Sequence, residues 1–188
     1  MKKALTAVVV AALAIIALVV IAFSIHMPSE ETSITEETVS SDSVMRNPPQ
    51  LTVLGADDSA QARLGTYSWD WEDEDGGKGT SSDSVHPLAA QEYTPVLSVD
   101  TDDSAQNVTL AFEADVEPDS VSVRAWDTAY WGADDSAPSV EVPVTQDDEG
   151  CIGFALLSYD AVYEVHAVWD SADDYSGDAY YSFATSIE

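Results

Sequence analysis

The chain has 188 residues, and its 35 Asp and Glu against 6 Lys and Arg give a formal net charge of −29 at pH 7. A surface this acidic repels nucleic acids and anionic lipid headgroups, so we exclude nucleic acid as a partner and expect cations or basic molecules to be attracted. Solubility in a salty or surface environment explains the same charge without a specific partner. The single cysteine, Cys151, excludes an intrachain disulfide, and its apolar surroundings predict a buried thiol rather than a nucleophile.

Residues 1–27 combine two N-terminal lysines, Lys2 and Lys3, with an apolar run that Thr6 alone interrupts before Phe23. About 20 apolar residues suffice to span a bilayer, and the lysines favour an N-terminus inside the cell. We therefore expect residues 4–25 to hold the chain in the cell membrane as a single-pass anchor, with the C-terminal domain outside the cell. Cleavage of the same segment as a signal peptide would secrete the domain instead.

Residues 28–49 are polar, acidic and free of aromatic side chains, which predicts a disordered linker. Residues 50–188 then form the folded domain. Short apolar or alternating runs are separated there by the Asp, Ser, Gly and Pro clusters that make tight turns. We expect nine strands, at Leu51–Leu54, Ala62–Trp71, Tyr93–Val99, Asn107–Ala114, Ser120–Asp127, Val140–Val144, Cys151–Leu157, Ala161–Asp170 and Asp178–Ile187. Apart from a short helical turn near Pro87–Gln91, this pattern is typical of an all-β fold, and we expect an Ig-like antiparallel β-sandwich.

The clearest alternation lies at Ala161–Trp169, which we expect to be a central strand. Tyr163, Val165, Ala167 and Trp169 share one face, and a face this apolar and aromatic predicts burial. Glu164 and His166 share the opposite face, where we expect surface side chains rather than acid–base chemistry.

The densest acidic cluster is Asp70–Gly77, and Asp70, Glu72, Asp73 and Asp75 are its candidate metal ligands. Calcium prefers several oxygen ligands from a flexible loop. The spacing does not match the twelve-residue calcium loop, so a solvated acidic loop is the main interpretation and a weak Ca²⁺ site the alternative.

Ser81–His86 brings serine, aspartate and histidine close together in the sequence. Catalytic triads are assembled in space rather than in such short runs, and no Gly-x-Ser-x-Gly elbow is present. We therefore assign no catalytic residue and no cofactor, and we interpret the segment as a loop.

Among the five tryptophans, Trp131 precedes a turn and is the best candidate for an exposed aromatic side chain. Trp126 lies on the strand face opposite Val121 and Val123. The two indoles together predict a ligand-binding patch, since exposed aromatic patches are typical of carbohydrate and peptide recognition.

The order of several short motifs resembles small membrane- or lipid-anchored, extracytoplasmic β-rich proteins of Gram-positive bacteria. The motifs are Gly65–Trp69, Gly79 with Ser82–Leu88, Pro118–Ser120, Val162–Trp169 and Gly177–Phe183. The resemblance covers about residues 49–187 and implies placement and fold but no catalytic residues. Some members carry a cysteine pair near the positions of Ser68 and Ser81, where this chain has serines, so that covalent link is absent here.

These observations favour a non-catalytic extracytoplasmic binding or accessory module of the cell envelope. Its partner would be an envelope protein, a peptide, a polymer or a cation, and the oligomeric state stays open. The alternatives are a Ca²⁺-stabilised adhesion-type module, a spacer subunit of an envelope complex, and a hydrolase that uses Ser81–His86.

A calcium site at Asp70, Glu72, Asp73 and Asp75 predicts that Ca²⁺ raises the melting temperature well beyond the effect of NaCl at equal ionic strength, because only a bound cation stabilises the folded state by mass action. Thermal unfolding followed by tryptophan fluorescence measures the difference. Equal melting temperatures in the two salts would exclude the site.

Overall fold

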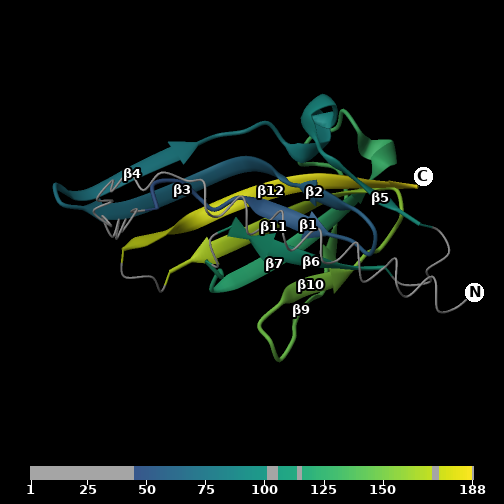
Figure 1. The fold of residues 1–188 in the computed structure, drawn as a ribbon. Helices are drawn as coiled ribbons and strands as arrows, with labels where there is room; N and C mark the ends of the chain where they lie inside the picture. The colour runs from purple at the N-terminus through teal and green to yellow at the C-terminus, as the bar shows by residue number, and fades with distance from the viewer. Residues whose placement is uncertain (1–44, 101–105, 114–115, 171–173, 188) are drawn as a thin grey trace, which may run out of the picture. The chain divides into compact units, whose positions relative to one another are not determined.

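The computed structural model describes residues 45–100, 106–113, 116–170 and 174–187. The expected membrane anchor and most of the expected linker lie outside these residues. Within the described ranges, no helix is long and apolar enough to cross a membrane. The described residues are all-β, as predicted, and they form two sheets that face each other in a sandwich-like arrangement (Figure 1).

The larger sheet has seven strands, six of them in the order β4-β3-β12-β11-β7-β8 with antiparallel neighbours. The seventh strand, β5, pairs in parallel with the end of β12, which differs from the all-antiparallel expectation. The strands are β3 (Arg63–Asp73), β4 (Gly76–Ser82), β5 (Val96–Val99), β7 (Ser120–Asp127), β8 (Val140–Val142), β11 (Ala161–Trp169) and β12 (Tyr175–Ile187).

The smaller sheet has five strands in the antiparallel order β2-β1-β6-β10-β9. They are β1 (Leu51–Leu54), β2 (Ser59–Gln61), β6 (Asn107–Phe112), β9 (Val144–Gln146) and β10 (Ile152–Ala155). All nine predicted strands have a counterpart in the two sheets. The predicted strand Val140–Val144 is divided in two, because Pro143 has no N–H to donate to a ladder.

Two strands were not predicted, β2 and β4. The sequence of β4 is Gly-Gly-Lys-Gly-Thr-Ser-Ser, which carries neither apolar alternation nor β-branched enrichment. Pairing with β3 across a tight turn makes it a strand, because the backbone ladder needs no apolar side chains. The register places Ser68 directly opposite Ser81.

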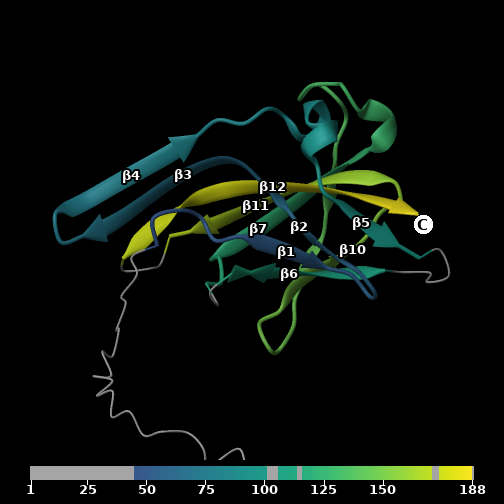
Figure 2. The same ribbon diagram turned by 45° about the horizontal axis from the view of Figure 1, so that its top comes forward.

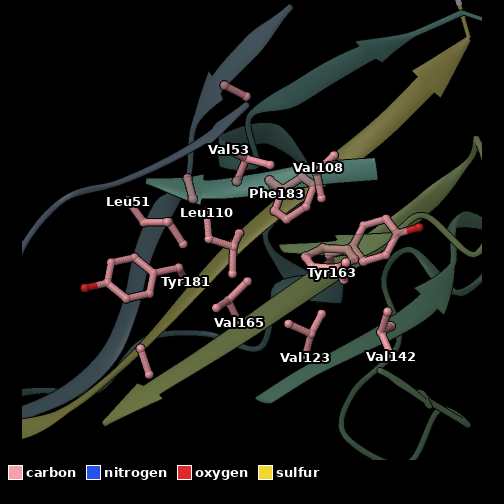
Figure 3. Close-up of a cluster of buried hydrophobic side chains, with 14 of the residues drawn as sticks. Leu51, Val53, Val108, Leu110, Val123, Val142, Tyr163, Val165, Tyr181 and Phe183 are labelled. Carbon is pink, nitrogen blue, oxygen red and sulfur yellow. The ribbon is translucent and has the colours of Figure 1, made fainter. Parts of the chain in front are cut away.

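The core lies between the two sheets, and its side chains point toward one another from both (Figure 3). Leu51, Val53, Val108 and Leu110 come from the smaller sheet and face a layer from β7, β11 and β12. The predicted inward face of β11 is confirmed, since Tyr163, Val165, Ala167 and Trp169 are all buried. The prediction that β11 is central is also confirmed, because β12 and β7 flank it.

Aromatic rings fill one end of this core. The Trp69 and Trp169 rings meet edge to face at 5.3 Å between centroids, and Phe112 meets Trp169 at 5.5 Å. Both indoles are anchored, since Trp69 donates to the carbonyl of Met45 and Trp169 to that of Val116. The interpretation of these tryptophans as structural agrees with their burial.

The residues before β1 already contact the domain. Besides the bond from Trp69 to Met45, the Tyr181 hydroxyl donates to the carbonyl of Pro49 at 2.6 Å. Burial raises the pKa of the Tyr181 phenol, so that the phenol stays protonated and keeps donating. The last residues of the expected linker therefore belong to the folded part.

A second, smaller cluster covers part of the outer face of the larger sheet, the face turned away from the core. Leu88, Trp126 and Val162 form it, and Leu88 belongs to the 3₁₀ turn η1 (Pro87–Ala89). Two further turns are η2 (Gln91–Tyr93), which follows η1 after Ala90, and η4 (Thr128–Tyr130), which follows β7. In Figure 2 these segments lie on the side of the larger sheet opposite β1 and β6.

The change Trp169→Ala should cost about 3–5 kcal/mol of unfolding free energy, because it empties a buried site lined by other aromatic rings. The change His166→Ala should cost about 1 kcal/mol or less, since this side chain is 30% exposed. Urea unfolding of both variants measures the two values. The reverse ranking would contradict the orientation of β11.

Candidate ligand-binding pocket

Four polar side chains lie in one row across the outer face of the larger sheet. The register pairs Arg63 of β3 with Ser182 of β12, Ser182 with Glu164 of β11, and Glu164 with Arg124 of β7. Directly paired residues on one face are neighbours, with Cβ atoms about 4.5–5.5 Å apart. We call these four residues the polar row.

A β-bulge places Arg63 in this row. The pairing of β12 with β3 shifts between Ala179 and Tyr181, where Gly65 and Thr66 of β3 stand opposite a single residue. One extra residue inverts the alternation of a strand. Trp69 therefore faces the core, whereas Arg63, also at an odd-numbered position, faces outward.

Glu164 and Arg124 form an ion pair at the centre of the row. The Arg124 Nε donates to Glu164 Oε1 at 2.7 Å, and Nη2 lies 2.6 Å from the same oxygen. The guanidinium also lies over the Trp126 ring, 4.8 Å from its centroid. The expectation that Glu164 is a surface side chain is wrong, because only 8% of the side chain is exposed.

Ser182 and Arg63 have capacity to bind a ligand. Ser182 is only 2% exposed, and its hydroxyl has no hydrogen-bond partner in the described structure. The Arg63 Nη2 donates to the Ser84 hydroxyl at 2.6 Å, and Arg63 makes no ion pair with any carboxylate among the described residues. A guanidinium carries five N–H donors, so most of those of Arg63 remain available.

The loop that precedes η1 forms one wall of a cavity that lies over the polar row. The His86 Nδ1 accepts a hydrogen bond from the backbone N–H of Leu88 at 3.3 Å and so caps the turn. The His86 ring meets Trp126 edge to face at 5.0 Å. Its Nε2 is buried and has no partner in the described part of the chain, so another donor or acceptor group would find a match there.

A cavity of about 430 Å³ opens over Arg63, Ser182, Glu164 and Arg124. Its remaining lining comes from the β-bulge, the loop before η1, the neighbouring part of β12 and the loop after η4. These residues are Gly65, Thr66, Ser84, Val85, His86, Pro87, Asp134, Asp135, Tyr180 and Tyr181. The sequence has six basic residues, four of them after the N-terminal lysines, and two of those four line this one cavity.

A second cross-strand row lies next to the polar row and contains His166 of β11 and Tyr180 of β12. The His166 ring stacks on Tyr180 with 4.1 Å between centroids, and its Nε2 lies 3.1 Å from Asp178 Oδ2. These contacts hold Tyr180 at the border of the cavity. The description of His166 as lying on the less apolar face is confirmed, since its side chain is partly exposed and faces away from the core.

The predicted aromatic patch gathers as expected but is not exposed. Trp126 and Trp131 belong to the same cluster on the outer face. Trp126 is only 3% exposed, and Trp131 is partly buried against it, because η1 places Leu88 on top of the indole. A direct role of these rings in ligand binding stays a prediction, whereas their packing supports the wall of the cavity.

The predicted acidic cluster is a hairpin rather than a loop. Asp70, Glu72 and Asp73 lie along β3, and Asp75 lies in the turn, where its N–H donates to Asp73. No group of three or more His, Cys, Asp or Glu side chains among the described residues is arranged to hold a metal ion. The alternation of a strand sends neighbouring carboxylates to opposite faces, and the Ca²⁺ site stays a prediction for the melting-temperature comparison.

The segment Ser81–His86 does not bring a serine onto the histidine. Within the described structure, the His86 Nδ1 accepts from Leu88, its Nε2 has no partner, and the Ser84 hydroxyl accepts from Arg63.

The thiol of Cys151 is exposed, so the prediction of burial is wrong. The residue closes a turn in which its N–H donates to Asp147. The nearby Asp147 carboxylate raises the pKa of this thiol, which keeps it in the unreactive protonated form.

Comparison of the chain with protein-family models, with curated proteins and with solved structures found no match.

The pocket was not predicted from the sequence. Arg124 and Glu164 stand on the outward faces of predicted strands, and that placement was the available signal. Only the register shows that the two side chains meet.

Removing the cation from the ion pair should destabilise the fold, because Glu164 would stay buried without a partner. We expect Arg124→Met to cost about 2–4 kcal/mol, somewhat below the loss for a fully buried pair, since the Arg124 side chain is 43% exposed. The double change Arg124→Met with Glu164→Met should recover most of this loss. Urea unfolding measures all three proteins, with the exposed Arg46→Met as control; a single variant as stable as the unmodified chain would contradict the argument.

Proposed function

We propose that the chain is a non-catalytic binding or accessory module of the cell envelope. In this proposal residues 4–25 anchor it in the membrane, and an Ig-like sandwich domain is displayed outside the cell. The observation that carries the binding role is the cavity over the polar row, where the hydroxyl of the buried Ser182 has no partner among the described residues. A buried polar group without a partner costs free energy, which a ligand can recover.

Two features favour binding over catalysis. Nucleophilic hydrolysis needs a hydroxyl within hydrogen-bond reach of a base, and in the described cavity the hydroxyls of Ser84 and Ser182 have no such base. Among the described residues, Glu164 is the buried carboxylate of the cavity, and its Oε1 is already bonded to the Arg124 guanidinium, so this oxygen is not free to act on a substrate.

The size of the cavity indicates the kind of contact. Sites for small molecules are typically about 300–1,000 Å³, so a cavity of about 430 Å³ suits a small molecule or one unit of an envelope polymer. A flat adhesion surface would not need such a hollow.

A larger side chain at the border of the cavity tests the proposal. Val85 lines the cavity and is 58% exposed, so Val85→Trp should fill space without disturbing the core. Val140 is 57% exposed and lies outside the cavity, which makes Val140→Trp the matched control.

We expect a ligand-detected NMR screen of amino acids, peptides, sugars and sugar acids to find binders of the full chain in detergent micelles. Val85→Trp should lose these binders and Val140→Trp should keep them, with every ligand recovered chemically unchanged. Turnover of a ligand, binders that ignore Val85→Trp, or a screen without binders would overturn the proposal.

A further inference from the structure

We propose that the cavity recognises a small zwitterion, an amino acid or a short peptide with a free carboxylate and a free ammonium group. This inference rests on the proposed function and names the ligand class.

The carboxylate end lies at Arg63 and Ser182, which are direct cross-strand neighbours. Arg63 is the cation of the cavity that no carboxylate of the described chain neutralises, and one of its donors is used by Ser84. Beside it lies the Ser182 hydroxyl, a donor that no described residue uses. A guanidinium and a hydroxyl together match the two oxygens of a carboxylate, and charge-assisted hydrogen bonds of this kind are strong.

The ammonium end lies at Asp134 and Asp135, which come from the loop after η4 and line the same cavity. Asp134 Oδ1 accepts from the N–H and the hydroxyl of Ser136, and these bonds lower the pKa of the Asp134 carboxyl, so that the group is charged at neutral pH. Asp135 is exposed and forms no ion pair with a cation of the described chain. The two carboxylates therefore offer acceptors for an ammonium group.

The balance of charge disfavours simpler ligands. Arg63 and Arg124 stand against Glu164, Asp134 and Asp135, so neither sign dominates the cavity. A plain anion would meet the two aspartates and approach through the field of a chain with net charge −29. A plain cation would leave Arg63 and Ser182 unpaired and face the guanidinium. A zwitterion pairs both ends and carries no net charge.

Calorimetric titration of the full chain in detergent micelles tests the assignment with five probes. L-alanine, D-alanine and alanyl-alanine carry both groups, propionate carries only the carboxylate, and ethylamine carries only the ammonium. At least one of the first three should bind about tenfold or more tightly than propionate and ethylamine, because each lost charge-assisted pair costs at least that factor.

Substitutions show which residues of the cavity bind the carboxylate of the ligand and which bind its ammonium group. We expect Arg63→Gln to weaken the best zwitterion about tenfold or more, and Ser182→Ala to weaken it by a smaller factor of about three. Asp135→Asn should weaken the zwitterion but leave propionate unchanged or slightly tighter. The control Arg46→Gln removes an exposed arginine that does not line the cavity, so it should change no affinity.

The outcomes separate this inference from the proposed function. Equal affinity for propionate and alanine, or a zwitterion affinity that Arg63→Gln does not change, would overturn the zwitterion. If none of the five probes binds while the screen yields other ligands sensitive to Val85→Trp, the inference fails and the proposed function stands. If no ligand is sensitive to Val85→Trp, both fail.

Discussion

The larger sheet depends on the neutralisation of one buried carboxylate. Glu164 lies at the middle of the central strand with 8% of its side chain exposed, and Arg124 on the adjacent strand is its cation. Burying an ionised carboxylate is costly unless it is paired and hydrogen-bonded. The pair therefore fixes the alignment of β7 with β11, and because Arg124 also lies over Trp126, it ties the polar row to the apolar cluster beside it.

The two faces of the larger sheet have different roles, core packing on the inner face and the cavity on the outer face. The inner face supplies the aromatic and branched side chains that meet the smaller sheet, and this packing is where most of the stability arises. The outer face is covered only in part, by Leu88 over Trp126 and Val162. The uncovered part holds the polar row, and the cavity opens over it.

Much of the fold could be predicted from the sequence, and little of the pocket. Alternation along Ala161–Trp169 was sufficient to assign the buried face, because burial of one face imposes a period of two. The strand β4 gave no such signal, since its Gly and Ser residues pair through the backbone alone. Glu164 was misjudged because burial of a polar side chain depends on its neighbours across the sheet, and those follow from register, which periodicity does not contain.

The β-bulge at Gly65 and Thr66 changes which residues of the chain around β3 face the core. On the N-terminal side of the bulge, even-numbered residues such as Ala62 face inward, and on the other side odd-numbered residues such as Trp69 do so. Gain or loss of one residue at this point would switch the side on which Arg63 emerges while the aromatic pairing further along β3 kept its phase. Because that switch would turn the Arg63 guanidinium into the core and Ala62 out of it, the bulge is the feature that lets one strand carry an arginine outside and a buried tryptophan inside.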